Sequence, residues 1–527
     1  MNTSNEWCFR ELFGCPRVFF DYFVRMFVRK KKNPSGKVSV QVIDKSTGKY
    51  KVIHTIGSSS DPRVIEDFVS QGREWIDRKG GSLSFDFSND ILLTEQVLEG
   101  VESFKQIGLD LLLGQIFDAT GFNQVEDLIL RYLVIYRLAY PKSKLKTVEY
   151  LNRYHQLNWH EDQVYRYLDK LYNTHKEIVQ QISFDHTQQV LGGQISMVFY
   201  DVTTLYFEID QGDELRKTGF SKEGKHQNPQ IVLGLLVSIN GYPLAYDIFE
   251  GNKFEGQTML PIISSFKQKY KLDQLVIVAD SGLLSQDNID LLQRKGFQFI
   301  LGARIKNESK AIKQAILSLN LTNGQSSVIQ KDELRLIITY SDKRAKKDLH
   351  NRTKGLKRLE NQVASGKLTK SNINKRGYNK YLKLEGSVKV IIDQEKFDQD
   401  AQWDGLKGYL TNTTLSDQMV LENYQQLWQI EKAFRIAKTD LKIRPIYHRL
   451  HRRIEAHICI TFVAYKVYKE LERLLKEKQS TISPQKAIEI AKSIFQLQIT
   501  TPTSKSVIKK TLILSEEQKA LAQLFGF

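Results

Sequence analysis

Three acidic side chains stand where a metal-dependent reaction at phosphate would need them. Asp201 and Asp280 each follow directly on a short apolar run, and Glu431 lies in a segment with helical periodicity. Side chains at the carboxyl ends of strands in an open α/β sheet face the crevice where ligands bind. A helix across those ends would add the third carboxylate, and three converging carboxylates suit hard divalent cations. The pattern alone therefore indicates a nuclease-like site, while a structural role for both aspartates as caps of strand-to-loop turns stays open.

Other common chemistries find little support in the chain. Residues 219–225 match the start of a phosphate-binding P-loop, but His226 replaces the hydroxyl residue that would hold Mg²⁺, and Pro229 prevents a following helix. We expect a basic loop there, between two strands and near Asp201. The histidines form no zinc-binding cluster, and no serine-hydrolase elbow occurs.

The composition indicates a polyanionic partner. The chain has 527 residues and a formal net charge of +17, so nucleic acid is the first candidate and an anionic membrane the second. Three cysteines without a C-x-x-C pair exclude a disulfide framework, and no apolar run reaches the ~18–20 residues of a membrane span. We expect a cytoplasmic, nucleoid-associated protein with no membrane partner.

Changes in pattern along the chain predict seven regions that would position the three acids. The fold class expected is an α/β core with a mixed sheet, interrupted by an insertion. A helical region before the core would be a DNA reader or, equally, a spacer. Met26 opens a cleaner pattern than the residues before it and is the expected natural start. The regions are 1–25 (possible upstream extension), 26–90 (small, β-rich, with a hairpin), 91–190 (helical, DNA-end-binding), 191–304 (first part of the core), 305–402 (polar, basic insertion), 403–450 (second part of the core, with the glutamate helix) and 451–527 (helical C-terminus).

Three segments around the acids resemble a known family. Residues 198–207, 276–285 and 430–441 resemble, in order, the three catalytic segments of DDE transposases of bacterial insertion sequences. One group of that family carries Tyr-x2-Arg-x3-Glu-x6-Lys, which Tyr424, Glu431 and Lys438 fit. Leu427 occupies the arginine position, so the arginine's role does not carry over, although Arg435 is a possible substitute. The long interval between Asp280 and Glu431 matches that group's β-rich insertion.

The resemblance implies an RNase H-like core in which Asp201, Asp280 and Glu431 bind two Mg²⁺ ions, with Mn²⁺ as a substitute. It implies hydrolysis at transposon ends, followed by attack of the freed 3′-OH on target DNA. It also implies a hairpin end intermediate held by Tyr424 and Lys438, double-stranded DNA partners (terminal inverted repeats and target), and a homodimer on paired ends.

Basic residues after the glutamate would clamp the DNA backbone. The basic stretch 343–358 would lie over the site or form a solvated helix, and Trp403 would stack on an unpaired base or be buried in the core. Two other functions stay open: an RNase H-like nuclease without strand transfer, and an inactive DNA-binding derivative. The full expected DNA-binding set is Tyr424, Arg435, Lys438, Lys442, Arg444, His448, Arg449, Arg452 and Arg453.

Overall fold

The computed structural model describes residues 26–80, 94–221, 224–283, 285–366, 368–374, 377–386, 389–502 and 504–527. The chain divides into two compact units. One comprises Met1–Val101 and Ile499–Val507, and the other comprises Glu102–Gln498 and Ile508–Phe527. The expected upstream extension, residues 1–25, lies outside the described residues.

A small sheet and one helix make up the described part near the N-terminus. Strands β1 (Met26–Lys32), β2 (Val38–Asp44) and β3 (Lys51–Ser59) form an antiparallel sheet in that order. Helix α2 (Pro62–Gly80) packs on it through a core that includes Val40, Ile65 and Val69. The strands agree with the expected hairpin, but the region 26–90 is not purely β-rich, because apolar residues recur at helical spacing after Pro62.

A mixed sheet of eight strands forms the centre of the larger unit. Its order is β10-β11-β14-β9-β8-β5-β6-β7, in which β8 runs parallel to both β5 and β9 and the other pairs are antiparallel. The strands are β5 (Met197–Tyr206), β6 (Gln230–Ser238), β7 (Pro243–Glu250), β8 (Val276–Ala279), β9 (Gln298–Ala303), β10 (Ser326–Lys331), β11 (Leu334–Tyr340) and β14 (Leu406–Thr411).

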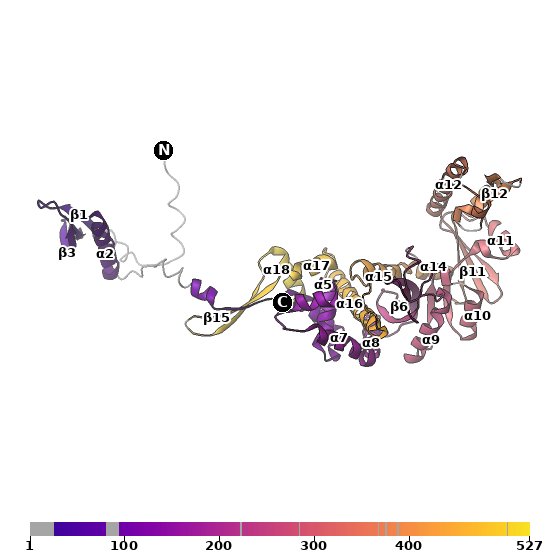
Figure 1. The fold of residues 1–527 in the computed structure, drawn as a ribbon, viewed down its shortest axis with the longest axis horizontal. Coiled ribbons are helices and arrows are strands. Elements are labelled where there is room, and N and C mark those ends of the chain that lie inside the picture. Colours follow the sequence, from indigo (N-terminus) through magenta and orange to yellow (C-terminus); the bar gives the residue numbers. More distant parts are fainter. Residues whose placement is uncertain are drawn as a thin grey trace. The chain divides into compact units, whose positions relative to one another are not determined.

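Helices cover both faces of this sheet (Figure 1). On one face lie α9 (Met259–Lys269), α10 (Gln286–Arg294) and α11 (Lys310–Leu317). On the other lie α14 (Asp417–Gln425) and α15 (Trp428–Thr439). Successive strand residues point to opposite faces, so in β5 Phe199 joins one core and Tyr200 the other. The expected mixed α/β sheet is present.

One long helix forms the centre of the helical region. Helix α16 (His451–Glu477) is buried along most of its length, including polar residues such as Glu455, Lys466 and Glu470. Around it lie α5 (Leu128–Ala139), α7 (Glu161–Lys170) and α8 (Lys176–Val190), which share its core. The apolar residues of α16 therefore supply core within one chain. Among the described residues, no helix is long and apolar enough to cross a membrane.

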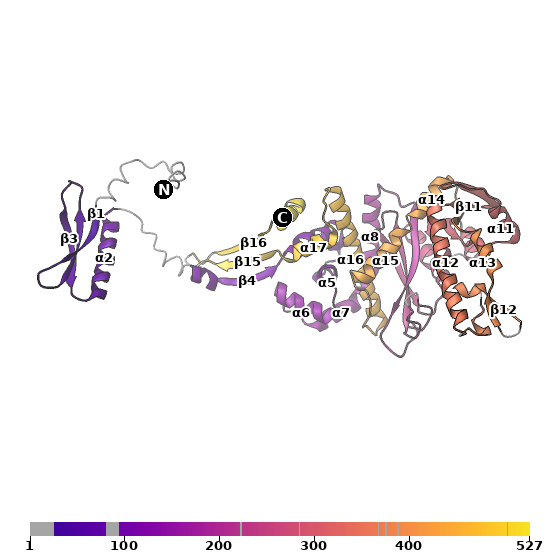
Figure 2. The same cartoon turned by 90° about the horizontal axis from the view of Figure 1, so that it is seen from above.

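Two regions expected to be helical also contain strands, as Figure 2 shows. Strands β15 (Phe495–Thr500) and β16 (Val507–Leu512) pair with β4 (Val101–Gln106) in the order β16-β15-β4. The expected helical C-terminus therefore also contains two strands. Helix α17 (Pro484–Lys492) ends before Phe495, whose ring stacks on Phe104 at 4.6 Å. Such a contact between distant segments leaves no signal in local periodicity.

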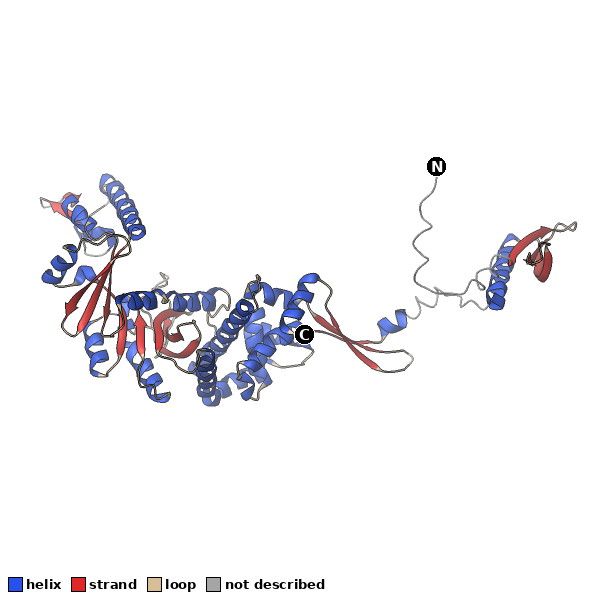
Figure 3. Ribbon diagram, turned by 180° about the vertical axis from the view of Figure 1, so that it is seen from behind, coloured by secondary structure: helices blue, strands red, loops and turns tan. Residues whose placement is uncertain are grey.

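The insertion is shorter and more helical than expected. Strands β10 and β11 extend the main sheet, because Leu336 buries on one face and Ile337 on the other. The inserted part therefore begins at α12 (Asp342–Ala364) and continues through β12 (Leu382–Glu385), β13 (Lys389–Ile392) and α13 (Gln394–Ala401), around a small core of its own. The prediction of a β-rich insertion over 305–402 is corrected in both extent and type; helices and strands are distinguished in Figure 3.

Candidate functional site

The sheet register places the two aspartates side by side. Parallel strands β5 and β8 pair Tyr200 with Ala279, so Asp201 and Asp280 occupy the next position on each strand. Neighbouring strands lie ~4.8 Å apart, and paired residues point to the same face. Both carboxylates thus share the face that α14 and α15 cover. Each is held locally, since Asp201 accepts from the N–H of Val202 and Asp280 from that of Ser281, both at 2.7 Å.

Helix α15 brings Glu431 to the same face. The helix docks through buried Ile430, Ala433 and Phe434, which leaves Glu431 exposed one turn from its start. Helices α14 and α15 are separate, because 3₁₀-type bonds such as Leu427 N–H to the Tyr424 carbonyl interrupt the α-helical pattern. Leu427, at the missing arginine position, is buried in the core.

The three carboxylates offer the donor chemistry that divalent ions require, since all are hard oxygen ligands. Asp201 and Asp280 are adjacent, and Asp280 and Glu431 both act electrostatically on the same neighbours, Tyr424 and Lys407. Among the described residues, however, no group of three or more His, Cys, Asp or Glu side chains lies close enough to hold a metal ion. The aspartate pair is assembled, and the glutamate stands on the same face without completing a three-ligand cluster.

Tyr424 contacts the site directly. Its side chain is 6 % exposed, and its hydroxyl donates to Oδ1 of Asp280 at 3.2 Å. Gly302 of β9 makes room for it, because a Cβ there would lie 2.4 Å from the hydroxyl oxygen. The ring of Tyr409 packs against it nearly edge-on, with centroids 4.8 Å apart. The immediate partner of Tyr424 is therefore a proposed metal ligand, whereas the expected contact with a DNA phosphate stays a prediction.

Sequence reasoning missed Lys407. This half-buried residue of β14 holds its ammonium 4.4 Å from the Tyr424 ring centroid, and the charges of Asp280 and Glu431 both act on it. Burial, reinforced by the positive charge of Arg344, lowers the pKa of Lys407. The only signal in the sequence was its place in the strand that follows the insertion, which does not distinguish it from other strand lysines.

The expected DNA-binding residues have three kinds of environment. Arg435, Lys442 and Arg449 are exposed. Lys438, Arg444 and His448 are half-buried, with the Arg444 guanidinium over the ring of Tyr206 at 5.7 Å. Arg452 and Arg453 both donate to Asp169 of α7, at 2.8 and 3.0 Å, so their charges are partly neutralised within the chain.

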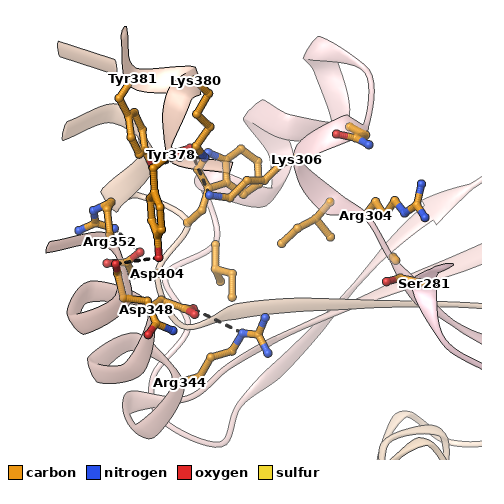
Figure 4. A pocket seen from close by; sticks show the side chains of 17 residues that line it. Ser281, Arg304, Lys306, Arg344, Asp348, Arg352, Tyr378, Lys380, Tyr381 and Asp404 are labelled. Atoms are coloured by element: carbon orange, nitrogen blue, oxygen red, sulfur yellow. Dashed lines mark hydrogen bonds and ion pairs between the residues drawn. The ribbon is translucent and has the colours of Figure 1, made fainter. Parts of the chain in front are cut away.

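A cavity of about 460 Å³ lies beside the loop that follows Asp280 (Figure 4). Its wall combines that loop and the end of β9 with the inserted subdomain, including half-buried Trp403. Most charges around it are paired. Arg344 lies 3.5 Å from Asp348, and Lys306 lies 3.1 Å from Asp400, which ties the core to α13. Arg352, expected to be part of a DNA-facing stretch, is buried against Asp404.

One family model and several solved structures are similar to this chain. The family model described as "Transposase DDE domain" matches residues 193–466, which contain all three acids. A piggyBac transposase synaptic complex with hairpin DNA is 9 % identical over 73 % of this chain and 78 % of that chain, with a TM-score of 0.37. A Mos1 transposase paired-end complex with the left transposon end is 10 % identical over 30 % of this chain and 53 % of that chain, with a TM-score of 0.15. No curated protein sequence matches. Because the family model spans more than half of the chain, the protein belongs to the DDE transposases.

Proposed function

We propose that this transposase cuts DNA at the ends of a bacterial insertion sequence and joins the freed 3′-OH ends to target DNA. The observation that carries the proposal is the pairing of Asp201 with Asp280 on one sheet face, across which α15 carries Glu431. Asp201 within β5, Asp280 directly after β8 and Glu431 on a covering helix would form an RNase H-like arrangement suited to phosphodiester chemistry.

The three acids would hold the metal ions. Asp201, Asp280 and Glu431 would bind two Mg²⁺ or Mn²⁺ ions, which when bound activate an attacking oxygen and stabilise a leaving one. The protein supplies no nucleophile, so its own residues orient the ligands and neutralise phosphate charge. Tyr424 fixes Asp280 through its hydroxyl, and Lys407 places a positive charge beside the acids.

Basic residues near the acids favour a DNA substrate. Lys442 and Arg449 are exposed shortly after the glutamate helix, and the chain carries a net charge of +17. Such residues bind the backbone without reading sequence. The partners proposed are the terminal inverted repeats and target DNA, bound by a homodimer with one active site per end. A hairpin end, held with Lys438, is the excision route that the family resemblance favours.

Cleavage of labelled element-end DNA in Mg²⁺ tests the proposal, with wild type compared with Glu431→Gln. Glu422→Gln is a matched control, because Glu422 lies on α14, is exposed, and only accepts a bond from Gln418 at 2.8 Å. We expect cutting at the element boundary by wild type and the control. The Glu431→Gln variant should bind the end normally and cut at least ~100-fold more slowly, as expected when a charge-stabilising group is lost.

The other outcomes separate the competing functions. Equal cutting by all three proteins would remove Glu431 from the site. Cutting at the end without joining to target would favour a nuclease. Binding without cutting by the wild type would favour an inactive derivative.

A further inference from the structure

A second cavity, of about 540 Å³, lies between the helical region and the loop that follows the glutamate helix. One side is formed by Arg137 of α5 and by the start of α6 (Lys144–His155), and the other by residues 442–448. His457 of α16 closes its inner end. All of these residues belong to the larger unit.

The charges around this cavity are of one sign. Arginine, lysine and histidine side chains line it, and among the described residues of its wall none is acidic. The first turn of α6 adds the positive end of a helix dipole. The cavity beside Asp280 differs, because there each of the cations Lys306, Arg344 and Arg352 has an aspartate partner. The basic residues of the second cavity are Arg137, Lys142, Lys144, Lys442, Arg444, His448 and His457.

Two of these basic residues are deeply buried, and no described residue forms an ion pair with either of them. Arg137 and Lys144 are each 5 % exposed. The Nε of Arg137 has no hydrogen-bond partner, and its Nη1 reaches only the Leu441 carbonyl, at 3.4 Å. Burial, reinforced by the like charge of Arg137, holds the pKa of Lys144 well below its usual range.

Such an arrangement is unfavourable without a bound anion. Buried charges are normally paired, so keeping Lys144 protonated beside the Arg137 guanidinium costs free energy unless an anion accompanies them. A phosphate group would satisfy both the Arg137 guanidinium and the Lys144 ammonium. The cavity is open to solvent, since Tyr447, one of the residues that line it, is 72 % exposed.

We infer that this cavity binds a backbone phosphate of the DNA, between Arg137 and Lys144 on one side and the 442–448 loop on the other. The inference rests on the proposed function, in that it takes the substrate to be DNA. Arg137 bonds to the carbonyl of Leu441, just beyond the end of α15. A phosphate held here therefore contacts the chain segment that leads away from Glu431. Arg137 would then bind both the DNA phosphate and the end of the glutamate helix.

The first test uses the full chain without DNA. Its melting temperature is measured in sodium phosphate and in sodium chloride at equal ionic strength. A ligand that binds only the folded state raises the melting temperature with concentration, so we expect a phosphate-dependent rise in wild type that Lys144→Met abolishes. Lys146→Met is the matched control, because Lys146 lies on the same helix but pairs with Glu149 outside the cavity. A rise that Lys144→Met leaves intact would overturn the inference.

The second test measures the salt dependence of DNA binding for the same proteins. Loss of one phosphate contact lowers the slope of log K against log salt by about 0.9 and weakens binding about five- to ten-fold at ~0.1 M salt. We expect both changes from Lys144→Met and from Lys442→Met. The second variant is included because the Lys442 side chain is exposed, so its replacement carries little risk of misfolding. Lys146→Met should match wild type.

These outcomes also separate the cavity from the proposed function. A phosphate-dependent rise with an unchanged DNA salt slope would overturn DNA as the occupant and assign the cavity to a free phosphate-bearing molecule. Absence of both effects, with metal-dependent cutting intact, would overturn the cavity alone. Absence of cutting, with both effects present, would overturn only the proposed reaction.

Discussion

Replacing Tyr424 with phenylalanine distinguishes two roles for this residue. The change removes one oxygen atom, and with it the hydrogen bond to Asp280 at 3.2 Å. If the hydroxyl orients Asp280, the variant should cut DNA more slowly while binding it normally. If the hydroxyl instead contacts a DNA phosphate, binding itself should weaken.

The size of the effect follows from the geometry. A hydrogen bond to a charged group contributes ~1.5–3 kcal/mol. This one is longer than the usual ~2.7–2.8 Å for an O–H···O bond, and Asp280 is exposed, so water can replace part of it. We therefore expect a loss of about 1 kcal/mol, which is about a five-fold slower cleavage step. Folding stability should change little, because the ring keeps its packing.

The assay is single-turnover cleavage of end DNA at saturating protein, with binding measured separately at several salt concentrations. Tyr409→Phe is the control, because Tyr409 is equally buried at 6 % exposure, lies edge-on to Tyr424, and carries no bond to the acids. A five-fold slower step in Tyr424→Phe only, with the same salt slope as wild type, supports the positioning role.

Gly302→Ala provides an independent check on the same bond. The added Cβ would lie 2.4 Å from the Tyr424 oxygen and push it away from Asp280 without removing it. The rate loss in Gly302→Ala should therefore be smaller when Phe already stands at 424. Fully additive losses, or a Tyr424→Phe variant whose affinity for end DNA falls by as much as its cleavage rate, would refute the positioning role.

Three further predictions concern charge. Lys407→Met should slow cleavage about ten-fold and lower the salt slope of DNA binding by about 0.9, because a positive charge beside the acids is lost. Unchanged cleavage would exclude Lys407 from the site. Lys466, fully buried and bonded to the Ser183 carbonyl at 3.0 Å, has its pKa held well below the usual range by burial. Protonation is therefore costly at neutral pH, and Lys466→Met should raise the free energy of unfolding in urea by about 1 kcal/mol; a decrease would contradict this. Finally, stability should fall as pH drops from about 6.5 towards 4, by up to about 1.4 kcal/mol per pH unit for each histidine that is neutral when folded and protonated when unfolded. Asp110, whose pKa burial raises to about 6, offsets part of this. The histidines meant are His155, His186 and His448, whose pKa burial lowers to about 4. Equal unfolding midpoints at pH 7 and 5.5 would contradict the claim that they are neutral in the folded state.

Local patterns predicted the parts of the fold that depend on neighbouring residues. The alternation of β1 and the apolar runs before Asp201 and Asp280 each corresponded to a strand. The rule that parallel strand ends meet at one edge of a sheet predicted that the two aspartates lie together, although Asp201 lies within β5 and only Asp280 follows the end of its strand. Leu334–Tyr340 was likewise recognisable as a strand, but its place in the main sheet was not.

Features that depend on distant contacts were not predictable in the same way. β11 reads as part of an insertion until β14, beyond the inserted helices, pairs with it. Lys407 and Gly302 come into contact with Tyr424 only because β14 and β9 lie side by side and Tyr424 packs over both strands. Arg452 and Arg453 looked like a DNA-facing stripe, yet a single acid in another helix, Asp169, bonds to both.

The contrast between the two cavities shows what charge counting in a sequence leaves out. The stretch 343–358 and the residues after Glu431 are similarly basic as sequence; the second was expected to meet DNA, and the first either to do so or to form a solvated helix. In the folded chain Arg344 and Arg352 are balanced by Asp348 and Asp404. Arg137, which no pattern singled out, has no such partner. A buried cation without an acid is costly unless an anion completes it, so the absence of a partner among the described residues of that cavity, rather than the density of basic residues, marks where this transposase would grip phosphate.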